Sequence, residues 1–405
     1  MRAMKDSGIE WIGIIPEEWK VIRAKYFTTI TNGCDPKSDG DVPVYGSGTE
    51  SFKTCGESKD GPAVLLGRKG TIDIPRYVEG KYWNVDTAFD AKFDETQYIP
   101  ELYYYAAMCF DYKYYVSMTT LPSMTQTNYG NMYLPLTSLD EQKSIVSFVK
   151  AKCAEIDALI AAKEKTNALL KEQRQSIIYE AVTKGLDPSA PMKDSGVEWI
   201  GKIPEGWNIV ALKRLGTPST GSTPAKDHSE YWDGNIPWLS SKDLKADYLC
   251  DSEDHVTEEA VEKCGLTVYD ANTLVFCVRS GILRHTFPVT IAKMPTTINQ
   301  DLRALTLSDN AFPDFVLYYL KGMNDTIVTL YQKIGATVES IEMEWFNYLP
   351  VVLPPLEEQK AIAQYLTETC NEIDSIIASN DDTIQKLKEY RQSVIYEAVT
   401  GKIEV

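Results

Sequence analysis

The sequence predicts an α+β protein that arose by tandem duplication. Two globular α+β domains would be separated by two long helices, paired as an antiparallel coiled coil about a pseudo-two-fold axis. Three observations predict this fold. A short block and a long block each occur twice, the long block has the apolar spacing of a coiled coil, and the segments between blocks carry short apolar runs bounded by turn signals.

The repeated blocks define a common frame. The short block reads MKDSGIEWIGIIPEEWKV at 4–21 and MKDSGVEWIGKIPEGWNI at 192–209, with 13 of 18 positions identical. The long block occupies 139–183 and 356–400, with 24 of 45 positions identical. The offsets are 188 and 217, so the intervening segment is 29 residues longer in the second copy. The intervening segments share no comparable identity, which favours one scaffold presenting two different recognition surfaces over two copies that drifted without purpose.

The short block is interpreted as a packing arm at the start of each copy. It places tryptophans around an Ile-Pro pair, at Trp11 and Trp19 and again at Trp199 and Trp207. Aromatic rings bury large apolar areas, so a structural role is expected. Residues 185–192, GLDPSAPM, are the expected linker between the copies.

The intervening segments, 22–133 and 210–351, predict two domains of one α+β fold. Both are rich in aromatic residues and contain strand-like runs such as DVPVYGSG, PAVLLGRKGTI, TLVFCVRSGIL and FPVTIA. Each also contains one expected short helix, at 100–110 and at 313–321. The two helices agree in character and place, which indicates a common fold.

The long blocks predict helices of about 45 residues, or about 65 Å at the usual rise. Neither contains Pro or Gly internally, and a glycine follows each where a C-cap belongs. Lys163 is expected opposite Asn380, and these two together with Arg174 and Arg391 would fix the register. The alternative is that each helix packs only on its own domain. The predicted coiled-coil and partner-binding positions are Ile156, Ile160, Leu170, Arg174, Ile373, Ile377, Leu387 and Arg391.

These blocks divide the chain into four parts. The arms at 4–21 and 192–209 belong to the two globular domains. The expected boundaries are a first domain over 1–135, a central helix over 136–185, a second domain over 186–352 and a distal helix over 353–405.

The composition is that of a globular protein, with 43% apolar and 24% charged residues. No apolar run approaches the roughly 18 residues that a membrane helix needs, and the N-terminus lacks the apolar stretch of a signal peptide. Eight scattered cysteines without a CxxC pair indicate reduced thiols and a cytoplasmic protein. All three histidines lie in the second half, which excludes a histidine-based centre serving both halves.

Two turns after predicted strands are candidate contacts for phosphates or bases. The turn RKG at 68–70 follows the apolar run AVLLG, and RSG at 279–281 follows TLVFCV, so both place a cation in a glycine turn. Such a turn lets the backbone approach a phosphate or a base edge closely. Arg284 and His285 extend the second group. An ordinary surface turn with a solvated cation is the alternative.

A small polar run closes each segment before the long helix. It reads TTLPSMTQTNYGNMYLPL in the first copy and GATVESIEMEWFNYLPVVL in the second. Hydroxyl and amide side chains there, such as Ser123, Thr125 and Thr337, are candidates for contacts with bases or phosphates.

No catalytic motif accompanies these features. The sequence has no GxxxxGK(S/T) loop, no Asn-Pro-Pro-aromatic or Asp-Pro-Pro-Tyr run, no GxSxG turn and no zinc-ligand cysteine spacing. The chain is therefore predicted to be non-catalytic, with no metal or cofactor of its own.

The sequence resembles the specificity (S) subunits of type I restriction–modification enzymes. The resemblance rests on KDSGIEWIGIIPEEW with KDSGVEWIGKIPEGW, LPLTSLDEQKSI with LPPLEEQKAI, the tails IIYEAVTKG and VIYEAVTGK, and TGSTP…YWDGNIPWLSSKDL at 220–244. It covers essentially the whole chain. It implies two target recognition domains, at 22–135 and 210–352, each reading one half of a bipartite, gapped site in double-stranded DNA. The paired helices would hold the two halves apart.

The resemblance also implies partners. Two methyltransferase subunits would dock on the helices, and two ATP-dependent restriction/translocase subunits would join them; S-adenosylmethionine, ATP and Mg²⁺ would belong to these partners. Because the net charge is −17, the chain alone is expected to bind DNA poorly, with the methyltransferase subunits supplying much of the positive surface. The acidic stretch 243–262 is expected to face away from DNA.

The residues expected to contact DNA lie in the two cation turns, the closing runs and the 220–244 run. They are Arg68, Lys69, Ser123, Thr125, Lys242, Arg279, Arg284 and Thr337. Two alternatives stay open. One is a duplicated interaction scaffold without a DNA role, and the other is the recognition part of a fused restriction–methylation enzyme, against which a start at Met1 or Met4 argues.

Overall fold

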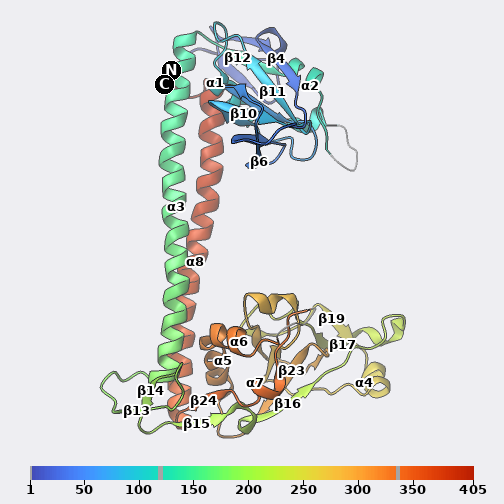
Figure 1. The fold of residues 1–405 in the computed structure, drawn as a ribbon, viewed down its shortest axis with the longest axis vertical. Coiled ribbons are helices and arrows are strands. Elements are labelled where there is room, and N and C mark those ends of the chain that lie inside the picture. The colour runs from blue at the N-terminus through green and yellow to red at the C-terminus, as the bar shows by residue number, and fades with distance from the viewer. Residues whose placement is uncertain (1, 117–121, 334–337) are drawn as a thin grey trace. The chain divides into compact units, whose positions relative to one another are not determined.

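The computed structural model describes residues 2–116, 122–333 and 338–405, which form two compact units. The first unit comprises Met1–Lys165 and Asn380–Val405, and the second comprises Thr166–Ser379. Each unit contains one globular α+β domain and part of both long helices (Figure 1). The units cut across the helices because apolar residues of both helices enter the core of each domain.

The first domain is built on two four-stranded sheets. Its strands are β4 (Thr28–Asn32), β5 (Val42–Tyr45), β6 (Ser51–Cys55), β7 (Lys59–Asp60), β8 (Ala63–Gly67), β9 (Arg76–Val78), β10 (Lys81–Asn84) and β11 (Ala88–Phe93). One sheet has the antiparallel order β4-β11-β8-β9, and the other has the order β6-β5-β10-β7. Strand β8 is buried at every position because its run AVLLG is apolar throughout. Two helices, α1 (Pro100–Ala107) and α2 (Gln126–Asn131), complete the domain.

The second domain repeats this plan with additions. Its strands are β16 (Gly216–Thr220), β17 (Trp232–Leu239), β18 (Tyr248–Leu249), β19 (Asp254–Val256), β20 (Thr273–Cys277), β21 (Val289–Ala292), β22 (Thr297–Ile298) and β23 (Leu302–Leu307). The sheets have the orders β16-β23-β20-β21-β18 and β19-β17-β22. The helices are α4 (Glu258–Cys264), α5 (Pro313–Gly322), α6 (Asn324–Leu330) and α7 (Met343–Phe346).

The common fold predicted for the two domains is confirmed. The expected short helices are α1 and α5, and the expected strands are β5, β8, β20 and β21. Strand β16 follows β4 by 188 residues, whereas β20 follows β8 by 210. Of the 29 extra residues in the second copy, 22 therefore lie between these strands, in the span that forms β17, β18, β19 and α4.

Each arm forms a hairpin and then a strand that pairs with the strand leading into a long helix. The hairpins are β1 (Met4–Asp6) with β2 (Ile14–Pro16) and β13 (Met192–Asp194) with β14 (Lys202–Pro204). The following pairs, also antiparallel, are β3 (Lys20–Arg23) with β12 (Tyr133–Leu136) and β15 (Asn208–Ala211) with β24 (Pro350–Leu353). The arms are thus part of the packed structure, as predicted.

The long blocks form α3 (Leu139–Lys184) and α8 (Leu356–Val399), of 46 and 44 residues. Gly185 and Gly401 follow them with φ of +79° and +72°, a left-handed C-cap conformation that glycine adopts without strain. Among the described residues, no helix is both long enough and apolar enough to cross a membrane.

The two helices pair antiparallel and bury a common seam. In the first unit, Lys163 Nζ donates to Asn380 Oδ1 over 2.8 Å, as predicted. The apolar seam of that unit consists of Ile156, Ile160, Ile384 and Leu387. In the second unit Ile373 is buried, whereas Leu170 and Ile377 are half-buried. Both helices also pack on the globular domains. The alternative that each helix packs only on its own domain is therefore wrong, because the helices contact each other as well as the domains.

The seam arginines find carboxylates across the helix pair. Arg391 Nε donates to Asp157 Oδ1 at 2.9 Å in the first unit, and Arg174 Nε lies 3.2 Å from Asp374 Oδ1 in the second. Arg391 follows Arg174 by 217 residues, and Asp374 follows Asp157 by the same number. The same ion pair is therefore made twice, once with the arginine on α8 and once with the arginine on α3. Such reciprocal contacts are the signature of a repeated, self-complementary interface.

A tryptophan from each arm joins the start of one long helix to the end of the other. Trp19 is buried and its Nε1 donates to a carboxylate oxygen of Glu141 at 3.0 Å, while Trp207 donates to Glu358 at 2.9 Å. Each ring also lies against the C-cap glycine of the opposite helix, where a Cβ would approach it to 2.9 Å in the first unit and 3.1 Å in the second. A Cβ at Gly401 would thus clash with Trp19, and one at Gly185 would crowd Trp207.

A buried glutamine fastens each domain to the helix that follows it. Gln142 Oε1 accepts from the amide of Ile99 at 2.9 Å, and its Nε2 donates to the carbonyls of Gln97 and Thr137 at 3.0 and 2.9 Å. Gln359 makes the same three bonds to backbone groups before α5 and α8, at 2.8 to 3.0 Å. Both glutamine side chains are fully buried, so these hydrogen bonds take the place of the bonds that their amide groups would otherwise form with water.

We predict that Gln359→Ala lowers the free energy of unfolding of the second unit by about 2–4 kcal/mol, because it leaves buried backbone donors and acceptors without partners. Urea unfolding followed by tryptophan fluorescence and circular dichroism measures this. The control is Gln364→Ala, an exposed glutamine on the same helix, which should change stability by less than about 0.5 kcal/mol. Equal effects of the two substitutions would contradict the role assigned to Gln359.

Candidate nucleic-acid interface

In the first domain, the turn after β8 is held on two sides by backbone hydrogen bonds. The amide of Arg68 donates to the carbonyl of Thr87, just before β11, at 2.8 Å. On the other side Lys69 forms an antiparallel bridge with Ser123 of the closing run, flanked by two backbone bonds of 3.0 Å. The predicted turn and the predicted closing run are thus joined; we call this contact, residues 68–70 with 122–124, the turn–loop junction.

The second domain builds the same junction from residues 278–280 and 339–341. The amide of Val278 donates to the carbonyl of Asp301 at 2.8 Å, and Arg279 bridges Ser340 between backbone bonds of 3.0 and 2.8 Å. Lys69 and Arg279 therefore occupy equivalent positions, because each forms the bridge to the closing run of its own domain.

The sequence prediction had placed Arg68 and Arg279 at equivalent positions, and this register is wrong by one residue. Matching the two glycines of the turns produced the error, because the structure aligns Gly70 with Ser280. Gly70 turns with φ of +82°, whereas Ser280 is extended and caps the 3₁₀ turn at Gly281–Arg284. A glycine turn therefore occurs only at the first of the two junctions.

In the first domain, Lys69 is the most available of the predicted contacts. It is exposed, and within the described part of the chain its ammonium group has no ion-pair partner. Arg68 instead donates to the main-chain oxygen of Asp86 at 3.1 Å, with that residue's carboxylate at 3.8 Å. Thr125 caps α2, its hydroxyl accepting from the amide of Asn128 at 3.0 Å. At the tip of this junction, Lys69 is thus a cation without an ion-pair partner among the described residues.

In the second domain, both predicted arginines are paired with acids. Arg279 Nε donates to Asp301 Oδ1 at 2.7 Å. Arg284 donates to Glu339 Oε1 through Nε at 2.9 Å and also through Nη2. The backbone amide and the Arg284 guanidinium hold the pKa of Glu339 below its ordinary value. Thr337 lies outside the described residues.

Lys242 has a different setting from the other predicted contacts. It follows β17 and donates to Glu253 and Asp254, both at 2.9 Å. These hydrogen bonds raise its pKa, so it stays charged, and its charge is matched by two carboxylates of the acidic stretch. No hydrogen bond among the described residues connects it with the turn–loop junction.

Two exposed aromatic side chains of the second closing segment were not predicted. Trp345 of α7 is 69% exposed and Tyr348 is 62% exposed. The Lys213 ammonium lies 3.7 Å from the Tyr348 ring centroid, which lowers the pKa of that phenol. The run MEWFNY in the closing segment could have indicated these residues, because it contains both aromatic and polar side chains.

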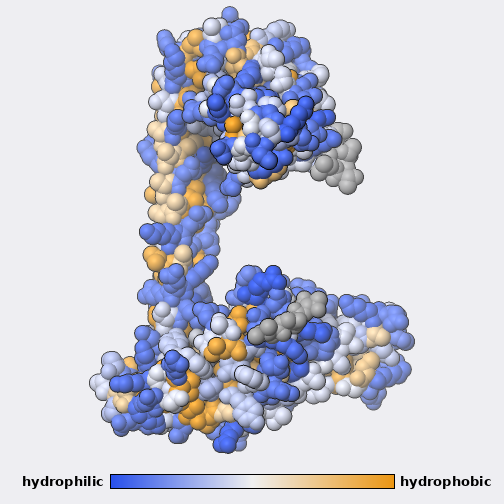
Figure 2. Space-filling model, viewed as in Figure 1, coloured by the Kyte–Doolittle hydropathy of each residue, from blue (hydrophilic) through white to orange (hydrophobic). Residues whose placement is uncertain are grey.

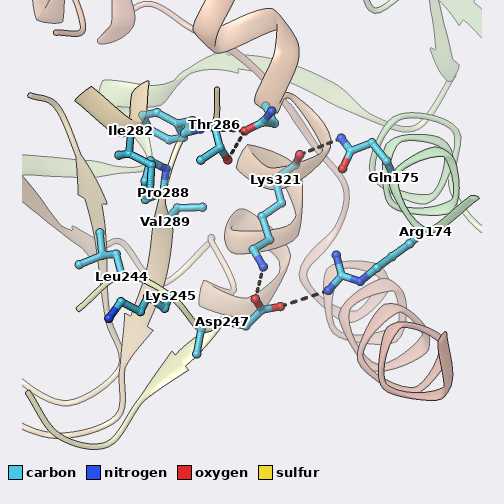
Figure 3. A pocket seen from close by; sticks show the side chains of 13 residues that line it. Arg174, Gln175, Leu244, Lys245, Asp247, Ile282, Thr286, Pro288, Val289 and Lys321 are labelled. Carbon is cyan, nitrogen blue, oxygen red and sulfur yellow. Dashed lines mark hydrogen bonds and ion pairs between the residues drawn. The ribbon is translucent and has the colours of Figure 1, made fainter. Parts of the chain in front are cut away.

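A cavity of about 490 Å³ lies in the second unit between α3, α5 and the segment before β18 (Figure 3). Asp247 lines this cavity, bound to Lys321 of α5 and 3.7 Å from Arg174 of α3. Gln175 of α3 donates to the carbonyls of Lys321 and Gly322 at 3.0 and 3.2 Å. The Asp247 carboxylate thus connects the second domain to α3.

The comparisons with known proteins identify the family. The family model for the type I restriction modification DNA specificity domain matches residues 16–171 and 204–387, once in each copy. The chain belongs to this family. The two matched regions cover both globular domains and the greater part of both long helices.

Curated relatives of the family carry the same designation. The specificity subunit of the type I restriction enzyme EcoR124I/EcoR124II from Escherichia coli is 26% identical over 67% of this chain and 64% of its own length. The MjaIX specificity subunit from Methanocaldococcus jannaschii is 33% identical over 42% of this chain and 39% of its own. The chain thus spans less than two thirds of the length of these relatives.

Solved structures share the fold. A chain from a study of complex assembly and conformational transition of the type I R-M system has a TM-score of 0.75 at 17% identity, covering 96% of this chain and 99% of its own. The HsdS subunit from Thermoanaerobacter tengcongensis has a TM-score of 0.52 at 16% identity, covering 96% and 98%. Within residues 2–116, 122–333 and 338–405, no group of three or more His, Cys, Asp or Glu side chains is placed to hold a metal ion.

We predict that Asp247→Asn destabilises the second unit by about 1–3 kcal/mol, because two partly buried cations lose their shared counter-charge. Urea unfolding at constant ionic strength measures the loss. Asp309→Asn, which removes an exposed carboxylate from the same unit, is the matched control and should have no measurable effect. The assignment is wrong if both variants unfold at the same denaturant concentration.

Proposed function

We propose that this chain is the DNA sequence-specificity subunit of a type I restriction–modification complex. The observation that carries the proposal is the turn–loop junction, which is built twice with the same backbone hydrogen bonds and with different side chains at its tip. Phosphate contacts position a protein on DNA, whereas side chains at a fixed tip distinguish bases. Each domain reads one half of a bipartite site in double-stranded DNA. Membership of the family favours this function over a duplicated scaffold without a DNA role.

The paired helices separate the two half-sites and carry the partner subunits. Leu159 of α3 and Ile376 of α8 occupy equivalent positions of the repeat and are 55% and 49% exposed. Figure 2 shows apolar side chains at the surface of these helices. Exposed apolar residues at equivalent positions of two repeats fit two copies of one partner, and we assign them to two methyltransferase subunits.

The chemistry belongs to the partners. The methyltransferase subunits bind S-adenosylmethionine and methylate adenine N6, and two restriction/translocase subunits use ATP and Mg²⁺, while this chain catalyses nothing. Because the chain carries net −17, its partners supply much of the positive surface that holds the DNA. The complex works in the cytoplasm, where the eight free cysteines stay reduced.

The decisive experiment is modified-base sequencing of host DNA after co-expression of this chain with its own methyltransferase gene. A gapped motif carrying N6-methyladenine should appear, and it should be absent when this chain is omitted. A soluble complex that methylates no defined motif would overturn the proposal.

We expect Lys69→Ala to reduce methylation about tenfold at sites that carry the half-site of the first domain, because one base or phosphate contact is lost. Recognition of the other half-site should stay unchanged. The measurement is the methylated fraction across a library that varies each half-site separately. Lys81→Ala, an exposed lysine on β10 of the same domain, is the control for lost charge. Loss of both half-sites would indicate a folding or assembly defect instead.

Shortening both helices should shorten the gap. Deleting 160–166 and 377–383 removes one equivalent heptad from each helix, about 10 Å or close to three base pairs. The methylated motif should then keep both half-sites and lose about three base pairs of spacing. Altered half-sites with an unchanged gap would refute the helices as the element that sets the spacing.

A further inference from the structure

Arg279 is held in one orientation at the tip of the second junction. Its side chain is 56% exposed, yet its Nε donates to Asp301 Oδ1 at 2.7 Å. Asp301 is itself fixed, because its amide donates to Asn299 Oδ1 at 3.0 Å and its carbonyl accepts from the amides of Val278 and Arg279. The backbone of Arg279 is held from the opposite side by the bridge to Ser340. An arginine pre-oriented in this way loses less conformational freedom on binding.

The orientation leaves a defined recognition edge. A guanidinium group is planar and has five N–H donors. Since Asp301 takes the Nε donor, the two terminal nitrogens remain available, and the described part of the chain gives them no other partner. Two parallel donors match the O6 and N7 acceptors that guanine presents in the major groove, and this pairing is the commonest specific contact of arginine with DNA.

The neighbouring arginine and the other domain lack this arrangement. Arg284 donates through both Nε and Nη2 to Glu339, so one of its two terminal nitrogens already has a partner. At the first junction the equivalents of Arg279 and Asp301 are Lys69 and Thr87, which have no guanidinium fork and no carboxylate. A lysine acts as a point charge and does not impose the bidentate geometry.

We propose that Arg279 reads a guanine in the half-site of the second domain, and that Asp301 is the positioning residue that aims it. The inference rests on the proposed function and adds the base and the residue pair. The negative charge of Asp301 can lie close to the DNA because the ion pair with Arg279 neutralises it.

The test uses the complete complex of this chain with its methyltransferase and a plasmid library in which each base pair of the methylated motif is varied in turn. The wild-type complex should prefer G·C at one position of one half-site. Arg279→Lys, which keeps the charge and removes the fork, should lower that preference by on the order of tenfold to a hundredfold. Asp301→Asn should lower it several-fold. The double variant should discriminate no worse than Arg279→Lys alone, because Asp301 acts through Arg279.

The controls separate this inference from the function on which it rests. Lys263→Ala removes an exposed cation of α4 and should leave the motif unchanged. The other half-site is an internal control in every variant. If the wild-type complex methylates a bipartite motif but Arg279→Lys keeps full discrimination at every position, the guanine assignment is wrong and the function stands. If the wild-type complex has no motif, the function itself is overturned.

Discussion

Each long helix carries an apolar stripe that is covered partly by the globular domains and partly by a second helix, and in this chain the second helix is its own repeat. The antiparallel pairing brings the start of one helix beside the end of the other. The arm tryptophans and the buried glutamines then attach a domain at each such meeting of helix ends. Each domain that carries a turn–loop junction is therefore attached where the ends of the two helices meet.

This arrangement explains where the two copies agree and where they differ. The repeated blocks contain the residues with fixed partners, which are the tryptophans, the glutamates they bind and the glutamines, and a C-cap glycine follows each long block. The turn–loop junctions keep their geometry through backbone hydrogen bonds, which do not depend on side-chain identity. Side chains at the tip are thus free to change, and they do, from Lys69 beside Thr87 to Arg279 beside Asp301. A backbone-defined platform with exchangeable side chains suits two domains that read different sequences.

Much of this could be predicted, because strong periodicity and repetition are visible in one sequence. Helices of more than forty residues, their seam and both C-caps follow from spacing and from single glycines. The junction register could not be predicted, since it depends on which residue of the turn pairs with Thr87 or Asp301 more than a dozen residues later. The partners of Arg174 and Arg284 were equally hidden, because ion pairs form between segments that only the fold brings together. The structural role of Gln142 and Gln359 also went unrecognised, since a glutamine in a charged helical turn looks solvated.

The division of the chain into units has a consequence for its biosynthesis. The second unit is one continuous stretch, Thr166–Ser379, whereas the first needs both the early part of the chain and Asn380–Val405. Ile395, Ala398 and Val399 lie in the core of that first unit, and Trp19 closes against Gly401. On the ribosome, the domain translated first must therefore wait for the last residues, while the domain translated second can close earlier. The core of the first unit is therefore complete only after the last residues have been translated, although most of that unit is translated first.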